Sequence, residues 1–109
     1  MKEIDDFVRY SILFSVYKSL FSGKQKIYLE AFLEEDNSFS EIAQALNVSR
    51  QAVFDNIKKA CKKLDFYEKN LNILESEKEY LVKLKKLKKE FTIENLDKLI
   101  SELEGTNVW

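Results

Sequence analysis

The sequence has no proline and no histidine, and its 109 residues include only two glycines and one cysteine. Without proline and with little glycine, it lacks the residues that stop helices and form the tight turns of β-hairpins. Hydrophobic residues make up 45% of the chain and charged residues 34%, a balance typical of globular rather than disordered proteins. The sequence therefore predicts an all-α fold.

The sequence also lacks the side chains that catalysis usually needs. There is no histidine base, no glycine-rich phosphate loop, no cysteine pair and no nucleophile spaced from a base. Cys61 lies beside Ala60 on a helical pattern, so we interpret it as a packed helix residue. Glu34, Glu35 and Asp36 point in different directions on a helix, which favours a solvated helix end over a metal site. We expect a protein that is not an enzyme and binds no cofactor or metal.

Long hydrophobic runs are absent as well. The apolar stretches are interrupted by charges and fall short of the roughly 20 consecutive apolar residues of a membrane span. The N-terminus carries Glu3, Asp5 and Asp6 and has no positive region followed by an uncharged apolar stretch, so we expect no secretory signal. The chain length fits one hydrophobic core. These features predict a cytoplasmic protein without membrane contact, folded as a single helical domain over residues 1–109.

Charge is distributed unevenly, although the formal net charge is −1. Residues 1–36 carry five basic and seven acidic side chains, residues 50–69 carry six and three, and residues 78–90 carry six and two. Lysine supplies nearly all of the positive charge, since Arg9 and Arg50 are the only arginines. Few side chains can therefore make the bidentate contacts of arginine with phosphate or guanine.

Aromatic side chains recur every three or four residues in the first predicted helix, which spans residues 4–22. They form one stripe along that helix, at Phe7, Tyr10, Phe14, Tyr17 and Phe21. The stripe can face either the core or a dimer partner. Gly23 interrupts the pattern, and apolar residues from Ile27 onward mark a second helix that ends in the acidic residues 34–36.

Two serines mark the starts of the next two predicted helices. Ser38 and Glu41 match a capping box, in which the serine side chain accepts from the Glu41 amide and the glutamate reaches back. The sequence therefore predicts a helix near residues 39–46. The second serine, Ser49, is the expected cap of a helix near residues 49–65.

The connection between these two helices is very short. Asn47 tolerates a left-handed conformation, and we expect the Val48 side chain to fill the core beneath the turn. Two helices joined by three or four residues, with a cap at the start of the second, are typical of a helix-turn-helix. The sequence thus predicts a helix-turn-helix core over about residues 20–66.

The second helix of this pair presents a polar and basic outer face. Its apolar positions recur at helical spacing, at Ala52, Val53, Ile57, Ala60 and Leu64. We predict that the following residues contact nucleic acid or a partner: Arg50, Gln51, Phe54, Asn56, Lys58, Lys59 and Lys62. The lysines attract phosphates, and Arg50, Gln51 and Asn56 can read bases. Phe54 either stacks on an unpaired base or packs against a neighbouring helix.

Asp55 lies among these residues and disfavours phosphate contact. A carboxylate can accept from a cytosine amino group, but without compensating arginines it lowers the electrostatic affinity that the lysines supply. The face therefore suits RNA or protein at least as well as DNA.

The sequence of this region resembles two groups of known proteins. Residues 38–64 resemble region 4 of bacterial sigma factors, in which Ser-x-x-Glu-Ile-Ala-x-x-Leu-x-Val-Ser leads into x-x-x-Val and then Ala and Leu. The flanks extend the match through residues 24–29 (Lys-Gln-x-x-Tyr-Leu), Asp36, residues 48–58 (Val-Ser-Arg-Gln-Ala-Val-Phe-Asp-Asn-Ile-Lys) and residues 67–68 (Tyr-Glu). With them, the chain resembles the YlxM family of bacterial signal-recognition-particle-associated proteins.

This resemblance covers residues 20–70 and implies more than the residues themselves show. It implies an all-α helix-turn-helix protein that regulates the signal recognition particle pathway by binding the particle's RNA or its GTPase subunit. Two other interpretations stay open at this point, a DNA-binding transcriptional regulator and a protein-interaction scaffold. Asp55 weakens the first of these two and leaves the second unaffected.

The C-terminal third, residues 68–104, is a lysine- and leucine-rich helical region in which Thr92 is the expected N-cap of a last helix. The lysine run at residues 83–89 either contacts phosphates or is the solvated face of an amphipathic helix, and we favour the solvated face. The end of the chain is expected to fray unless Trp109 docks. The leucines here and the N-terminal aromatic stripe offer more apolar surface than one small core needs, so we predict a homodimer.

Overall fold

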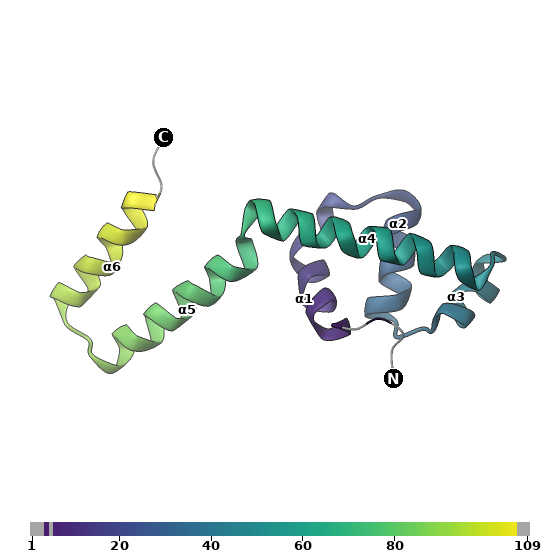
Figure 1. The fold of residues 1–109 in the computed structure, drawn as a ribbon. Coiled ribbons are helices and arrows are strands. Elements are labelled where there is room, and N and C mark those ends of the chain that lie inside the picture. The colour runs from purple at the N-terminus through teal and green to yellow at the C-terminus, as the bar shows by residue number, and fades with distance from the viewer. Residues whose placement is uncertain (1–3, 5, 107–109) are drawn as a thin grey trace. The chain divides into compact units, whose positions relative to one another are not determined.

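The computed structural model describes residue 4 and residues 6–106 (Figure 1). In that part of the chain there are six α-helices and no β-strand, which confirms the predicted all-α fold. Contacts divide the chain into two units, Met1–Ile73 and Leu74–Trp109. The single domain expected from the chain length stays a prediction, and the expectation for Trp109 lies outside the described residues.

The first predicted helix is shorter in the structure. α1 (Phe7–Tyr17) is followed by a 3₁₀ turn, η1 (Lys18–Leu20). The aromatic stripe faces the core, because Phe14, Tyr17 and Phe21 are at most 4% exposed. Phe14 and Phe21 meet edge to face, with ring centroids 5.9 Å apart. This part of the stripe is therefore used within the Met1–Ile73 unit.

α2 (Gly23–Leu29) begins at the glycine that interrupts the aromatic pattern. Gly23 has φ of 61°, a left-handed conformation that glycine adopts without the steric cost of a Cβ. The helix continues through one π turn, η2 (Glu30–Glu34), toward Asp36, whose φ is 59°. The predicted acidic helix end is thus present. The helix begins at Gly23, earlier than Ile27, the first apolar residue by which the sequence marks it.

α3 (Phe39–Leu46) and α4 (Arg50–Leu71) form the predicted helix-turn-helix. The capping box is complete: the Glu41 amide donates to Ser38 Oγ at 3.1 Å, and Glu41 Oε1 accepts from the Ser38 amide at 2.7 Å. At the start of α4, Ser49 Oγ accepts from the Ala52 amide at 3.0 Å. Both predicted caps are therefore confirmed.

The turn between α3 and α4 is held by backbone hydrogen bonds. Asn47 is left-handed as predicted, with φ of 55° and ψ of 49°. The amides of Asn47 and Val48 donate to the carbonyls of Gln44 and Ala43, which is a Schellman motif. The expectation that the Val48 side chain fills the core is wrong, because it is 39% exposed. The backbone of Val48 secures the turn, and its side chain stays at the surface.

α4 is the helix around which the Met1–Ile73 unit is built. Figure 1 shows it running along α1, α2 and α3, and each of these helices packs on it. Its predicted apolar face is confirmed, since Val53, Ile57 and Leu64 are fully buried and Ala60 is as well. Ala52 lies at the margin of that face and is half-buried.

The helical region predicted over residues 68–104 is interrupted near its start. α4 ends at Leu71 because Asn72 is left-handed, with φ of 53°, and α5 (Ile73–Lys89) begins directly after it. The buried Tyr17 hydroxyl accepts from the Ile73 amide at 3.2 Å and donates to the Glu68 carboxylate. A core residue of α1 thereby fixes the end of α4 and the first amide of α5.

α6 (Ile93–Thr106) follows α5 after a short connection. Thr92 Oγ1 accepts from the Asn95 amide at 3.0 Å, which confirms the predicted N-cap. In the described part of α5 and α6, every residue is at least partly exposed. The Leu74–Trp109 unit thus differs from the first unit, whose helices enclose a core.

We expect the variant Tyr17→Phe to lower the free energy of unfolding by about 1–3 kcal/mol, because it leaves Glu68 and the Ile73 amide without this hydroxyl. Urea denaturation followed by circular dichroism measures the change. Tyr80→Phe is the matched control, since Tyr80 is 37% exposed, and we expect it to stay within about 0.5 kcal/mol of the unmodified protein. Equal stability of the two variants would contradict a role for the Tyr17 hydroxyl.

Candidate nucleic-acid interface

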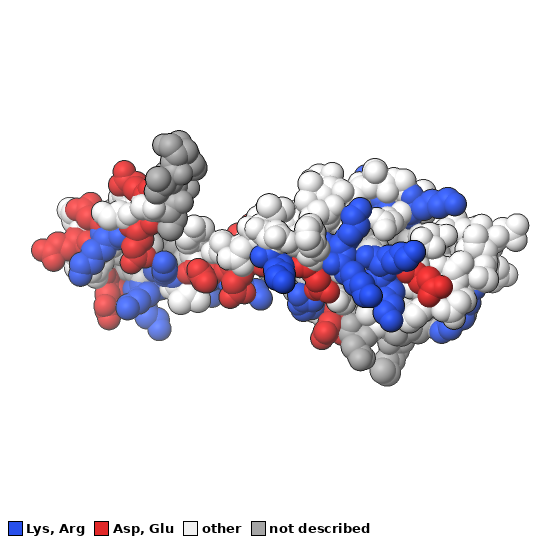
Figure 2. Space-filling model, turned by 45° about the horizontal axis from the view of Figure 1, so that its top comes forward, with Lys and Arg blue, Asp and Glu red and all other residues white. Residues whose placement is uncertain are grey.

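The outer face of α4 carries a group of lysines. Figure 2 shows basic side chains gathered on the Met1–Ile73 unit. Lys58, Lys59 and Lys62 are exposed and lie within about one helical turn of each other, opposite the buried apolar face. No described carboxylate lies within ion-pair distance of any of the three. These charges are therefore open to an anionic ligand.

Other basic residues of the same unit are neutralised locally. Arg9 Nη1 lies 2.7 Å from Asp65 Oδ1, and this hydrogen bond raises the pKa of the Arg9 guanidinium. Lys18 Nζ lies 3.0 Å from a Glu34 oxygen and 3.2 Å from a Glu30 oxygen. Arg9 and Lys18 are thus paired with carboxylates, whereas the three outer lysines of α4 are not paired with any described carboxylate.

Asp55 lies on the same exposed face, where its carboxylate is held by Gln51. Gln51 Nε2 donates to Asp55 Oδ1 at 3.0 Å, one helical turn apart. A negative charge thus lies beside the lysines, as the sequence indicates. The Gln51 amide has to give up or share this hydrogen bond before it can read a base.

Three of the predicted contact residues lie at the margins of this face. Asn56 is half-buried, and its Nδ2 donates to the Ala52 carbonyl of its own helix at 2.8 Å. The Arg50 guanidinium lies 5.7 Å from the ring centroid of Phe39. Phe54 is half-buried and meets Phe39 edge to face at 5.7 Å, which supports the packing interpretation of this residue. The exposed positions of the predicted set are Arg50, Gln51, Lys58, Lys59 and Lys62.

A hollow of about 420 Å³ adjoins this face between α1 and α4. Its walls include Tyr10 and Phe54, and Lys58 and Lys62 lie at it as well. The Tyr10 hydroxyl donates to Asp65 Oδ2 at 2.7 Å. Burial, followed by this hydrogen bond, raises the pKa of Tyr10 to about 12. Sequence reasoning missed the Tyr10 and Asp65 pair, because the two residues are 55 positions apart and no local pattern joins them.

Cys61 also lines the hollow but is only 4% exposed. Burial, with a smaller effect of the Asp65 charge, raises the pKa of the Cys61 thiol to about 12. This agrees with the interpretation of Cys61 as a packed helix residue. Among the described residues, no group of three or more acidic or cysteine side chains is placed to hold a metal ion. No helix in this part of the chain is long and apolar enough to cross a membrane.

The sequence is similar to those of known proteins. The model of the family UPF0122, described as "Putative helix-turn-helix protein, YlxM / p13 like", matches residues 4–103. A UPF0122 protein of Fusobacterium nucleatum is 47% identical over 100 residues, which are 92% of this chain and 97% of that protein. A UPF0122 protein of Staphylococcus aureus is 50% identical over 66 residues, which are 61% of this chain and 60% of that protein.

We expect Cys61 to resist a thiol reagent such as Ellman's reagent at pH 8 in the folded protein, because the thiolate is the reactive form and the thiol is buried. In guanidinium chloride one thiol per chain should react at once. The control is Ser101→Cys, an exposed position on α6 that should be labelled in the folded state. Rapid labelling of native Cys61 would contradict its burial.

Proposed function

The chain belongs to the UPF0122 family of YlxM/p13-like helix-turn-helix proteins, and we propose that it binds nucleic acid through the outer face of α4. The observation that carries this proposal is the set of exposed lysines at positions 58, 59 and 62, which have no described carboxylate within ion-pair distance. The YlxM resemblance of the sequence is confirmed at the level of the family. The likeness to sigma factor region 4 stays a prediction.

In the proposed complex the lysines contact phosphates and release bound counterions, which makes the affinity fall with salt. Arg50 and Gln51, at the start of α4, are the side chains nearest to base readout. Asn56 contributes less to base recognition than its residue type indicates, because its side-chain amide donates a hydrogen bond to a carbonyl of its own helix. Selectivity therefore rests on very few side chains.

RNA fits this face better than duplex DNA. A recognition helix that reads the major groove brings the residues of its first turns close to the DNA, and here those turns carry the Asp55 carboxylate. Arg50 is the only arginine of α4. Unpaired RNA offers phosphates and splayed bases without requiring the whole helix to enter a groove.

The family resemblance of the sequence supports a finer proposal. The RNA is that of the signal recognition particle, and the protein regulates the particle's GTPase without performing chemistry itself. It acts in the cytoplasm, where that RNA is found. Direct binding to the GTPase subunit, duplex DNA binding and a protein scaffold without nucleic acid are the alternative outcomes of the tests.

We expect the combined change of Lys58, Lys59 and Lys62 to alanine to weaken RNA binding about tenfold or more at moderate salt. The slope of log affinity against log salt should flatten, because each lost phosphate contact removes a released counterion. Filter binding across a salt series measures both quantities for the particle's RNA and for duplex DNA. Folding should survive, since exposed lysines contribute little stability.

Two control variants show whether the loss of binding is specific to the α4 lysines and depends on the charge of this face. Changing Lys78, Lys86 and Lys89 of α5 to alanine removes the same charge from another exposed helix face and should leave the affinity within about twofold. Asp55→Asn removes the negative charge beside the lysines and should strengthen binding several-fold. Loss of binding with the α5 set instead would place the interface on α5. Preference for duplex DNA over the RNA would favour the DNA-regulator interpretation.

The finer proposal predicts a change in GTP hydrolysis by the particle's GTPase when this protein is added. Turnover is measured with and without the protein, and with and without the RNA. An effect only with RNA present supports action through the RNA, and an effect without RNA indicates a direct contact with the GTPase. Identical rates in all four mixtures, with no detectable complex, would falsify the signal-recognition-particle role but not nucleic-acid binding itself.

A further inference from the structure

In the described part of the Leu74–Trp109 unit, no apolar side chain is fully buried. Neither α5 nor α6 contributes a buried side chain among the residues that the structure describes. Large hydrophobic side chains of this unit are between 37% and 74% exposed, at Tyr80, Leu81, Val82, Leu84, Phe91, Ile93 and Ile100. Apolar surface exposed to this extent on neighbouring helices is typical of an interaction surface.

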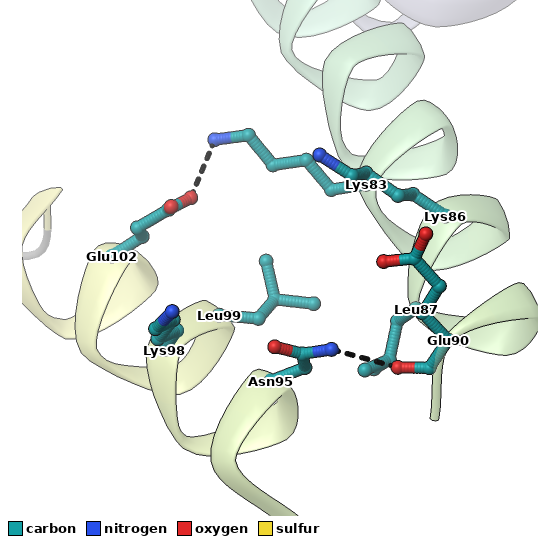
Figure 3. A pocket seen from close by; sticks show the side chains of 8 residues that line it. All are labelled: Lys83, Lys86, Leu87, Glu90, Asn95, Lys98, Leu99 and Glu102. Atoms are coloured by element: carbon teal, nitrogen blue, oxygen red, sulfur yellow. Dashed lines mark hydrogen bonds and ion pairs between the residues drawn. The ribbon is translucent and has the colours of Figure 1, made fainter. Parts of the chain in front are cut away.

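An open cleft of about 340 Å³ separates α5 from α6. Figure 3 shows Leu87 of α5 and Leu99 of α6 on its two sides. The ion pair from Lys83 Nζ to Glu102 Oε2, 2.9 Å long, spans it toward one end. The two helices are thus linked by polar contacts, but they leave these leucines partly uncovered.

The spacing of the apolar residues is that of helices in a bundle. Tyr80, Leu84 and Leu87 recur at intervals of four and three on α5, and Leu96, Leu99 and Leu103 recur at intervals of three and four on α6. Two helices cannot surround such stripes, whereas four helices can. The pair α5 and α6, called the hairpin below, therefore supplies two of the four helices of such a bundle.

The charges of α5 and α6 indicate which partner supplies the other two helices of the bundle. Within Ile73–Lys89, α5 carries six lysines and three glutamates, so its net charge is +3. Within Ile93–Thr106, α6 carries four acidic residues and one lysine, so its net charge is −3. A nucleic acid is attracted by α5 but repelled by α6. A second copy of the hairpin, turned by a two-fold axis, sets each basic helix beside an acidic one.

We propose that the α5–α6 hairpin binds the same hairpin of a second copy, forming a four-helix bundle in which α5 of each copy lies beside α6 of the other. The contact covers the apolar stripes and the open cleft. The aromatic stripe of α1 takes no part, since it packs inside its own unit. A dimer of this kind carries two helix-turn-helix units, which raises the affinity for a ligand with two binding sites.

Light scattering of the full chain without nucleic acid tests the proposal. At tens of micromolar we expect twice the chain mass of 12.9 kDa. The double variant Leu84→Glu and Ile100→Lys, at positions 54% and 44% exposed, should weaken self-association about tenfold or more while circular dichroism keeps its helical signal. Val8→Glu, at a 73% exposed position of α1, is the matched control and should stay dimeric.

A charge exchange tests the arrangement without touching the apolar residues. One variant carries Lys85→Glu and Lys88→Glu, and another carries Glu94→Lys and Asp97→Lys, all at exposed positions. Each alone should self-associate about tenfold more weakly, because α5 and α6 then have charges of the same sign. Their mixture should restore a dimer that contains both variants.

Three results would overturn the proposal. They are a mass of one chain for the unmodified protein, a double apolar variant that stays as dimeric as the control, and two charge variants that do not pair. The RNA-binding test rests on the α4 lysines, which none of these variants changes. Failure of the dimer and failure of the proposed function are therefore told apart.

Discussion

Burial of one face of α4 is the constraint on which the Met1–Ile73 unit depends. Val53, Ile57 and Leu64 are fully buried, and α1, α2 and α3 each pack on this helix. Because a helix has 3.6 residues per turn, burying these positions fixes the opposite direction for Lys58 and Lys62. The core therefore orients the candidate interface, and the lysines need no contacts of their own to hold that direction.

Local features of the fold could be predicted from the sequence, and features that depend on distant residues could not. The capping box at Ser38 joins groups three residues apart, so its pattern is visible in the sequence. The break at Asn72 has no such signal. Asn56 and Asn70 lie within α4 and bond to carbonyls four residues earlier, yet Asn72 ends the helix. The Tyr17 hydroxyl, which accepts a hydrogen bond from the Ile73 amide there, belongs to α1 and lies 56 residues earlier in the chain.

The candidate site divides in the same way. Helical spacing alone predicts which α4 residues point outward, and the exposed positions of Gln51, Lys58 and Lys59 agree with it. Whether Phe54 stacks on a base or packs on a helix could not be decided from spacing, because its neighbour Phe39 belongs to α3. That these outward residues contact nucleic acid stays a proposal. The structure adds that the Gln51 amide already donates a hydrogen bond to Asp55, whereas the lysines have no described carboxylate within ion-pair distance.

The two lysine-rich stretches have similar composition but different electrostatic surroundings. On α4 the three outer lysines have no described carboxylate within ion-pair distance, so a phosphate can approach them without displacing one. On α5 the lysines belong to a hairpin whose other helix is acidic, and Lys83 is already paired with Glu102. A phosphate approaching α5 has to compete with these acids. The same residue type therefore favours nucleic acid on one helix and a protein partner of mixed charge on the other.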